Sequence, residues 1–214
     1  NDTTQPSTPD SIFPNNWIST HDNGQVFIYP MEAENRRLEK REDIIELLKE
    51  KFKLSDIIDL SYFEGQNKFL EATGSMVLDR EYKIAYACLS TRTSLEVLDA
   101  FSRLSRYKLI TFNAVDQTGK AIYHTNVMMC VGTQFAVICL ESIADLSERK
   151  EVMKSLKETG KEIIEISFKQ LNEFAGNMLE LKSKNGEALL VMSIRAYQSL
   201  LPEQIKKLEK YCKI

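Results

Sequence analysis

WISTHDNGQVFIYP, at residues 17–30, contains the pattern that decides the fold. A short strand-like run at residues 17–20 leads into His21-Asp22-Asn23-Gly24, and a second apolar run follows at residues 25–30. Asp-Asn-Gly between two such runs is a strong hairpin signal, because Asn and Gly accept the backbone angles of a tight turn. We therefore expect an antiparallel hairpin at this position.

The same plan recurs three times along the chain. Further hairpins are expected at residues 75–89, 126–140 and 177–192. Each hairpin is followed by apolar residues at helical spacing, which predict helices at residues 34–52, 94–104, 147–157 and 202–211. Most units close with a short apolar strand, at residues 57–58, 109–112 and 163–166. Ser94 and Ser147 are expected to cap their helices, and Pro202 to begin the last one.

The sequence therefore predicts an α/β protein of ββαβ repeats, spaced by roughly fifty residues. A unit of that length cannot bury both faces of its sheet alone, so neighbouring units must cover it. A closed ring and an open solenoid both meet this condition, and a ring of five would lack only part of one unit. In a ring, the starts of the first strands would converge on the central axis, where several repeats together would assemble a site.

The composition is that of one globular domain. The chain has 214 residues and a net charge of −3, which gives no reason to expect nucleic acid or an anionic membrane as a partner. No apolar run reaches the length of about eighteen residues that a membrane helix needs. The polar start shows no signal peptide, and the absence of an initial Met predicts a missing N-terminus. The four cysteines form no Cys-x-x-Cys pair, so we expect buried free thiols in a reducing cytoplasm and no metal site.

Four polar clusters precede the first strands of the hairpins, at residues 9–17, 69–75, 123–127 and 172–178. Glu71 stands beside a glycine-bearing turn and can accept hydrogen bonds from a planar cation, although a solvated turn residue fits equally well. His124 precedes an almost wholly apolar run and, taken alone, would be a satisfied core histidine. Asp10 and Asn126 alone would be turn or capping residues. Asn15-Asn16-Trp17 is harder to explain this way, because paired amides have little strand propensity.

Together the clusters resemble the motifs of the guanidine-modifying enzymes, the pentein or amidinotransferase superfamily. LEATGS at residues 70–75 resembles the family's LEGTGS element, and YHTNVMM at residues 123–129 resembles its HxD or HxN element. PDSIFPNNW at residues 9–17 and FAGNML at residues 174–179 complete the pattern of the citrulline-utilisation hydrolase branch, which is related to arginine deiminases. The resemblance implies a five-bladed α/β propeller. Residues 1–214 would then form one propeller domain with about four of its five repeats, at roughly 9–60, 67–113, 120–167 and 172–214.

The resemblance also implies a mechanism and roles for the residues. A cysteine nucleophile would attack the central carbon of a guanidinium or ureido group and form a covalent intermediate. His124 would be the general acid and base, and Glu71 would bind the nitrogens of the planar group and hold His124. Asp10 and Asn16 would hydrogen-bond the same group. Asn126 stands where the deiminases have Asp, which favours a neutral ureido substrate such as citrulline over a guanidinium.

The sequence departs from the family pattern in two places. Ala72 stands where Gly is usual, which matters only if the backbone there needs a positive φ. The family's nucleophile lies in a glycine-rich strand after the fourth helix, whereas this chain stops at Ile214 with Cys212 in a Lys-rich context. We therefore expect the nucleophile beyond Ile214, an incomplete ring, and no activity from the chain alone. Cys139, diagonal to His124 if residues 132–133 form a tight turn, is a remote alternative nucleophile.

The leading hypothesis is thus a cytoplasmic hydrolase of C–N bonds that acts on citrulline, arginine or a derivative without metal or organic cofactor. An amidinotransferase, which differs only in the acceptor of the intermediate, and a non-catalytic binding propeller remain as alternatives. An incomplete ring would expose strand edges, so the chain alone is expected to be poorly stable or to pair with another chain, and a homo-oligomer stays open. The enzymatic hypothesis predicts that Glu71 and His124 approach within hydrogen-bonding reach at one pocket, with Asp10 and Asn16 facing it.

Overall fold

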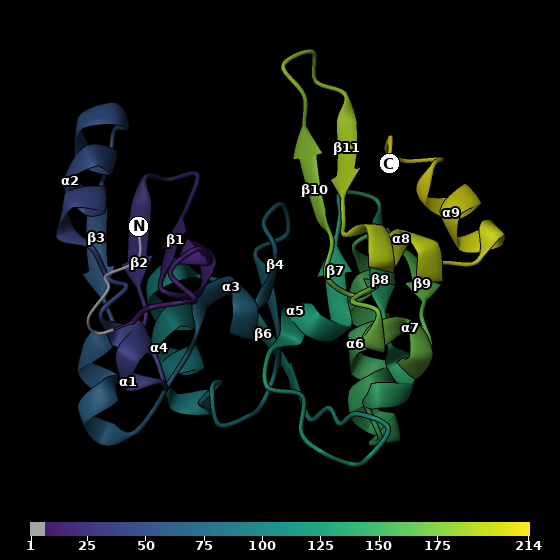
Figure 1. Ribbon diagram of the computed structural model, residues 1–214, viewed down its shortest axis with the longest axis horizontal. Coiled ribbons are helices and arrows are strands. Elements are labelled where there is room, and N and C mark those ends of the chain that lie inside the picture. Colours follow the sequence, from purple (N-terminus) through teal and green to yellow (C-terminus); the bar gives the residue numbers. More distant parts are fainter. Residues whose placement is uncertain (1–6) are drawn as a thin grey trace.

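The structure is a computed structural model that describes residues 7–214. Residues 1–6 of the predicted domain lie outside the described part. Figure 1 shows small sheets that follow one another from the N-terminal to the C-terminal side of the molecule, with helices packed beside them. The predicted α/β class is confirmed.

Four sheets correspond to the four predicted hairpins. Their strands are β1 (Ile18–Thr20), β2 (Gln25–Ile28) and β3 (Asp56–Asp59); β4 (Val77–Asp79), β5 (Ile84–Cys88) and β6 (Lys108–Phe112); β7 (Met129–Val131), β8 (Phe135–Ile138) and β9 (Glu162–Glu165); and β10 (Leu179–Lys182) with β11 (Ala188–Val191). In each three-stranded sheet the first two strands are antiparallel and the third is parallel to the second.

The fourth unit begins a parallel strand of the same kind. After its last helix the chain returns beside β11, where Lys213 forms a parallel bridge with Leu189. The N–H of Lys213 donates to the carbonyl of Ala188 at 2.9 Å, and the N–H of Leu190 donates to the carbonyl of Lys213 at 2.8 Å. Cys212 therefore lies in a buried turn after the helix and not inside it.

The helices that follow the hairpins are shorter than the sequence predicts in two cases. The longer helices are α2 (Glu42–Lys51), α4 (Leu95–Ser105), α6 (Leu146–Glu158), α8 (Ile194–Ser199) and α9 (Pro202–Leu208), and the short ones are α1 (Glu34–Arg37), α3 (Ala72–Ser75), α5 (Thr125–Met128) and α7 (Phe168–Asn172). Three 3₁₀ turns accompany them: η1 (Pro14–Asn16), η2 (Ser61–Gln66) and η3 (Leu140–Ser142). None of the helices in residues 7–214 has the length and apolar character to cross a membrane.

The predicted continuous helix at residues 34–52 is wrong, because it is interrupted between α1 and α2. Side chains near the interruption are held by polar partners elsewhere in the unit. The Nε of Arg37 donates to the carbonyl of Met31 at 3.0 Å, and the Nζ of Lys40 donates to the Glu64 carboxylate at 2.7 Å. Such tertiary contacts outweigh a favourable helical spacing.

The predicted serine caps differ from the caps in the structure. Asp145 caps α6 in place of Ser147, because its carboxylate accepts from the N–H groups of Ser147 and Glu148 at 2.7 and 3.0 Å. Ser94 does stand at the start of α4, but its hydroxyl accepts from the N–H of Phe69 and not from the helix. Pro202 occupies the first turn of α9, as predicted.

The first strands of the first three units are each preceded by a helical turn, which the sequence did not reveal. In the third unit the predicted strand at residues 126–131 is wrong in its first half, because α5 occupies that part and β7 begins only at Met129. The hydroxyl of Thr125 fixes this turn by donating to the carbonyl of Ser75 at 2.6 Å and accepting from the N–H of Cys88 at 2.8 Å. Turn α3 packs against both η1 and α5, which brings the first three polar clusters together.

The core lies between the units. Strand β5 is buried on both faces: Ile84, Tyr86 and Cys88 belong to one apolar cluster, whereas Ala85 and Ala87 belong to another. One face therefore packs toward α4 and the preceding unit, and the other packs toward the third unit. This arrangement agrees with the expectation that neighbouring repeats cover one another.

Candidate active site

A pocket of about 800 Å³ lies where the turns before the first strands meet. The predicted residues Asp10, Asn16, His124 and Asn126 all line it. Its remaining wall residues come from all four units: Phe13, Asn15, Arg36, Arg92, Tyr123, Val127, Phe174, Asn177, Met178, Leu179, Val191, Met192, Ser193 and Arg195. The converging turns thus build one site, here called the His124 pocket.

Glu71 and His124 form a close pair at this pocket. The Nε2 of His124 lies 2.7 Å from the Oε2 of Glu71. Glu71 is fully buried and does not line the pocket itself, so it stands behind the imidazole. Its backbone N–H donates to the Ser75 hydroxyl at 2.9 Å, and its Oε1 accepts from the N–H of Glu32 at 3.2 Å. Of the two roles expected for Glu71, holding His124 agrees with this position, whereas contact with a ligand in the pocket does not.

Two arginines stand close to the same carboxylate. The Nη1 atoms of Arg92 and Arg36 lie 3.4 and 3.9 Å from the Oε2 of Glu71. Burial alone would raise the pKa of the Glu71 carboxyl, but the hydrogen bond and charge of His124, and then the charge of Arg92, outweigh it and hold that pKa below its ordinary value. Glu71 is therefore an anion at neutral pH. The Nε2–H of His124 then donates to it, and Nδ1 is left without a hydrogen-bond partner among residues 7–214.

Gly74 permits the close approach of Asn16 and His124. A Cβ at position 74 would stand 2.5 Å from the Nδ2 of Asn16 and 3.0 Å from the Nδ1 of His124. Both contacts are shorter than, or at the limit of, what a real Cβ makes, so a larger residue would displace one of the two side chains. Gly74, in the second cluster, therefore allows Asn16 of the first cluster and His124 of the third to pack closely against it.

Sequence reasoning missed the three arginines of the pocket: Arg36, Arg92 and Arg195. Arg36 forms two hydrogen bonds with Glu39, at 3.0 and 3.1 Å, and Arg92 pairs with Glu32 at 3.1 Å. A signal for two of them is present in the chain, because Ser90-Thr91-Arg92 and Ser193-Ile194-Arg195 both follow the second strand of a hairpin. Asn177 of the fourth cluster also lines the pocket.

No thiol of this chain lines the pocket. Cys88, Cys130, Cys139 and Cys212 are all buried and unpaired. Burial raises the pKa of Cys88 to about 11 and that of Cys130 to about 12, and it also raises the pKa of the other two. Because a thiolate is the reactive form, none of these groups is prepared for attack.

Cys139 does not have the position expected for an alternative nucleophile. Its N–H donates to the carbonyl of Met128 at 3.0 Å, because α5 replaces the first half of the predicted strand. In residues 7–214 no group of three or more His, Cys, Asp or Glu side chains is arranged to hold a metal ion.

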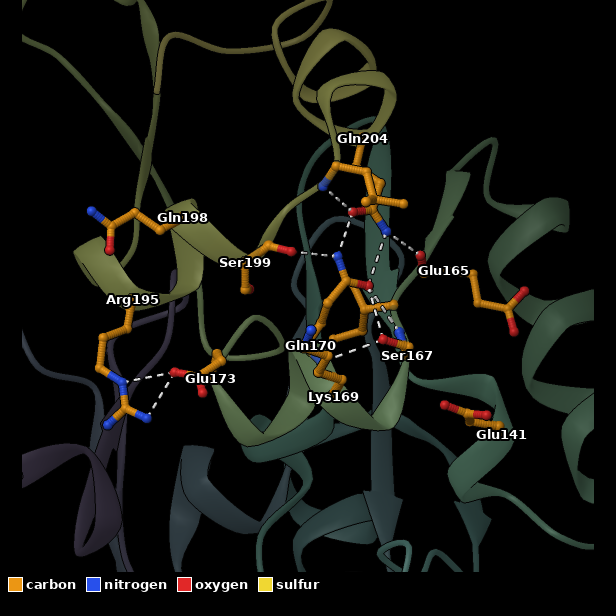
Figure 2. A pocket seen from close by; sticks show the side chains of 12 residues that line it. Glu141, Glu165, Ser167, Lys169, Gln170, Glu173, Arg195, Gln198, Ser199 and Gln204 are labelled. Carbon is orange, nitrogen blue, oxygen red and sulfur yellow. Dashed lines mark hydrogen bonds and ion pairs between the residues drawn. The ribbon is translucent and has the colours of Figure 1, made fainter.

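A second pocket of about 640 Å³ borders the first and shares Arg195 with it. Figure 2 shows Gln170 and Gln204 facing each other at its centre, with the amides joined to each other and to the carbonyls of Ser199 and Glu165. Its lining residues include no histidine, so it holds no pair of a histidine and a carboxylate. The Glu71–His124 pair therefore belongs to the His124 pocket alone of the two.

Comparisons with known proteins bear on the family and the fold of the chain. The family model for eukaryotic N,N dimethylarginine dimethylhydrolase matches residues 1–214. The fold is similar to that of ArgZ, an arginine dihydrolase from the ornithine-ammonia cycle in cyanobacteria: the apo structure gives a TM-score of 0.71 at 15% identity over 96% of this chain and 29% of that chain. The substrate-bound N-terminal domain of ArgZ gives 0.71 at 16% identity, over 96% and 68% of the two chains.

A dimethylarginine dimethylhydrolase from Pseudomonas aeruginosa, in complex with citrulline, has the same fold. Its TM-score is 0.61 at 17% identity, over 96% of this chain and 69% of that chain. No curated protein sequence matches the chain. The chain spans less than a third of full-length ArgZ, and identities this low show similarity of fold.

Proposed function

The chain belongs to the eukaryotic N,N-dimethylarginine dimethylhydrolase family, and with it to the guanidine-modifying superfamily; from this premise we propose that it is part of a cysteine-dependent hydrolase of a ureido or guanidino group. The observation that carries the proposal is the 2.7 Å contact between His124 and Glu71 at a pocket also lined by Asp10, Asn16 and Asn126. Citrulline or an arginine derivative is the proposed substrate. The complexes of ArgZ with substrate and of the Pseudomonas enzyme with citrulline support this choice.

His124 is the proposed general acid and base, acting through Nδ1. The Glu71 anion holds Nε2–H, so it orients the ring and stabilises the imidazolium when Nδ1 takes a proton. In the proposed reaction a thiolate bonds to the central carbon and the C–N bond breaks. The imidazolium gives its proton to the leaving nitrogen, and the imidazole then takes a proton from the water that displaces sulfur.

Asp10, Asn16 and Asn126 are the proposed hydrogen-bond partners of the planar group. The charges of the wall favour a neutral ureido group, because the His124 pocket presents three arginines and one carboxylate, that of Asp10. The buried charge of Glu71 is already shared among His124, Arg92 and Arg36. A guanidinium is itself a cation, so it would enter a pocket whose lining already carries more positive than negative charges.

The nucleophile is proposed to be a cysteine outside residues 1–214, because none of the four thiols in this chain lines the pocket. The chain alone would then bind substrate without turning it over.

The same reasoning extends to the fold, for which we propose the five-bladed propeller of the superfamily, incomplete in this chain. The exposed face of β10–β11 supports it, because Leu181 there is 45% exposed and lies outside the His124 pocket, whereas strand β5 is buried on both faces. Four unpaired thiols support a reducing cytoplasm as the location.

The test uses the gene product extended beyond Ile214 through the proposed nucleophile. It is incubated with citrulline, arginine, agmatine and dimethylarginine, and ammonia and the amine product are measured. We expect one substrate to turn over, and we expect His124→Ala to lower its rate by about a hundredfold or more. Asn185→Ala, in an exposed turn, is the control and should leave the rate unchanged.

Other outcomes would favour the alternative functions. Turnover that requires an added acceptor amine would identify an amidinotransferase. A folded protein that neither binds nor converts any of these compounds would contradict the hydrolase and favour a binding propeller.

A further inference from the structure

A buried ion pair joins the second unit to the third at the end of the strands that lies away from the His124 pocket. The Nζ of Lys161 lies 2.8 Å from the Oδ2 of Asp79, and the two side chains are 0% and 4% exposed. Asp79 ends β4, and Lys161 directly precedes β9, so the partners come from different units. Neither residue lines the His124 pocket, and the proposed chemistry has no use for either of them.

The hydrogen bonding of this pair is incomplete. Neither the Nζ of Lys161 nor the Oδ2 of Asp79 has a hydrogen bond of ordinary geometry within residues 7–214. The other Asp79 oxygen accepts from the N–H of Tyr82 at 3.2 Å, and the ammonium lies over the Tyr82 ring at 4.7 Å. Burying two charges costs free energy of desolvation, and apolar residues of similar volume often stabilise a fold equally well. Stability alone therefore does not account for a lysine and an aspartate at these two positions.

The backbone holds Lys161 in a defined place at the end of α6. The N–H of Gly160 donates to the carbonyl of Lys157 at 3.0 Å, and the N–H of Lys161 donates to the carbonyl of Leu156 at 3.0 Å. These two bonds form a Schellman motif, in which Gly160 has a φ of +74°. The helix end thus directs Lys161 toward the second unit.

The same interface carries the Glu71–His124 contact at its other end. Glu71 belongs to the second unit and His124 to the third, and their side chains are 2.7 Å apart. Strand β4 runs from the turn that follows Glu71 to Asp79, and it packs against β7. A tilt of the third unit on the second would therefore change both charged contacts together.

Between these two contacts the interface is largely apolar and adaptable. Met128 and Met129 are fully buried there and belong to the same apolar cluster as Val77 of β4. Methionine adapts to irregular spaces, and apolar contacts have no preferred direction. The bond from the Thr125 hydroxyl to the carbonyl of Ser75, at 2.6 Å, attaches the units near the pocket. A second directional contact at the far end is needed to define the tilt between them.

We propose that Lys161 and Asp79 are positioning residues, whose ion pair sets the tilt of the third unit on the second and so keeps His124 within hydrogen-bonding reach of Glu71. The consequence for turnover rests on the proposed function, whereas the consequence for the His124 ring does not. Charges in a medium of low dielectric constant interact strongly, and their separation leaves each one buried without a partner. This gives the pair a directional effect that apolar replacements would lack.

The test separates positioning from stability with paired variants. Asp79→Leu/Lys161→Met removes both charges at similar volume, whereas each single substitution leaves one buried charge unpaired. Lys161→Arg keeps the cation. Lys154→Met/Glu158→Leu is the matched control, because it makes the same kinds of change at an ion pair of α6 whose side chains are 74% and 60% exposed. Near-UV circular dichroism and urea unfolding report the fold and the stability of each variant.

The position of His124 is measured by ¹⁵N NMR of its imidazole in the 214-residue chain. The chain has only two histidines, so His21→Gln assigns both signals. At about pH 8.5, above the ordinary titration range of histidine, the wild type should show the Nε2–H tautomer that the Glu71 contact requires. In parallel, kcat and KM are measured with the gene product extended beyond Ile214.

We expect the double variant Asp79→Leu/Lys161→Met to unfold at the same urea concentration as the wild type or a higher one, and each single variant at a lower one. In the double variant an Nδ1–H form of His124 should appear, and kcat should fall by about tenfold while KM changes by less than about threefold. Lys161→Arg should retain more of the wild-type tautomer than Lys161→Met. The control should match the wild type in every measurement.

Two results for the double variant would overturn the proposal. A folded double variant with the wild-type tautomer and kcat would show that the tilt is set without the ion pair. A double variant less stable than either single variant, or unfolded, would show that the pair serves stability. An extended wild-type gene product without turnover would contradict the proposed function, and the tautomer of His124 in the 214-residue chain would still decide the role of the pair.

Discussion

The backbone angle φ at Ala72 gives a physical significance to the difference between this chain and the family pattern at that position. The family pattern has Gly where this chain has Ala72, and the φ of +38° shows that this position is one where glycine has a physical advantage. The residue follows Glu71 directly and begins the tight turn of α3. Its strained conformation is thus part of the turn that aims Glu71 at His124.

We predict that Ala72→Gly is nearly neutral although it deletes a fully buried methyl group. Release of the left-handed strain, about 1 to 2 kcal/mol, offsets the lost burial and the greater freedom of the unfolded chain. Ala85→Gly, in the buried strand β5 without such strain, should cost about 1 to 2 kcal/mol. Urea unfolding of both variants measures the difference. Equal destabilisation would show that position 72 is not strained.

At the residue scale, the sequence predicted the centre of the site better than its surroundings. Glu71, His124, Asp10, Asn16 and Asn126 stood at matching points of the repeats, and the structure places four of them on one pocket wall with Glu71 behind His124. The arginines were missed because arginine is usual on solvated surfaces, and only the packing of distant units decides which ones face inward. The burial of Glu71 was missed for the same reason.

Turn chemistry made the hairpins predictable at the scale of elements. Asp22-Asn23-Gly24 and Asn185-Gly186 lie in the turns of β1–β2 and β10–β11, with Gly24 and Gly186 at φ values of +82° and +81°. The helical turns before the first strands were not predicted, because their residues lack helical propensity. Side-chain bonds to other units, such as that of Thr125 to Ser75, impose them.

His21, in the β1–β2 turn, makes this element sensitive to pH. Burial lowers the pKa of His21 from 6.5 to about 4, with the charge of Arg80 assisting, that of Asp22 opposing and that of Lys83 assisting. The ring packs against Phe27 and Tyr107, and its Nε2 lies 2.9 Å from the Ser19 hydroxyl. The folded protein therefore keeps His21 neutral at a pH where the unfolded chain would protonate it.

We predict that the free energy of unfolding decreases as the pH falls, because the folded protein disfavours the protonated form of His21. Its contribution is fully present above the unfolded pKa of 6.5 and is lost progressively toward the folded pKa of about 4. Between pH 7 and 5 the loss should be about 1 kcal/mol, reduced from the full linkage value because the side chain is partly exposed. The His21→Gln variant should lack this part of the pH dependence in urea unfolding. A variant with the same pH dependence as wild type would contradict the assignment.

At the scale of the whole molecule, each unit depends on a neighbour to cover its sheet. The fully buried β5 lies between two apolar clusters, and the Tyr86 hydroxyl reaches the Ser155 hydroxyl on α6 at 2.9 Å. The hairpin β10–β11 has such cover on one face only, where the buried Leu190 belongs to the same apolar cluster as Leu200 and Leu208. The opposite face has no comparable cover among residues 7–214.

That uncovered face is apolar. Leu179, Leu181 and Val191 are 59%, 45% and 53% exposed, and strand pairing places them on the same side of the hairpin with the half-buried Leu189. Leu179 and Val191 form the end of this face that also lines the His124 pocket, and Leu181 lies beyond it. Contiguous exposed apolar residues of this kind favour association, whereas single ones do not. We therefore expect a contact of the chain with another chain to form at this face.

We predict that the 214-residue chain self-associates through this face as its concentration rises. Sedimentation velocity over a wide concentration range should show growth of a larger species. Leu181→Glu, which changes a residue outside the His124 pocket, should hold the chain as a monomer, because a charge on this face would have to be desolvated on contact. Leu104→Glu on α4, where the leucine is 47% exposed but belongs to no such group, is the matched control and should associate like wild type. A wild-type chain that stays monomeric throughout would show that the exposed face of β10–β11 is tolerated in solution, and association of the Leu181→Glu variant equal to wild type would place the contact on another surface.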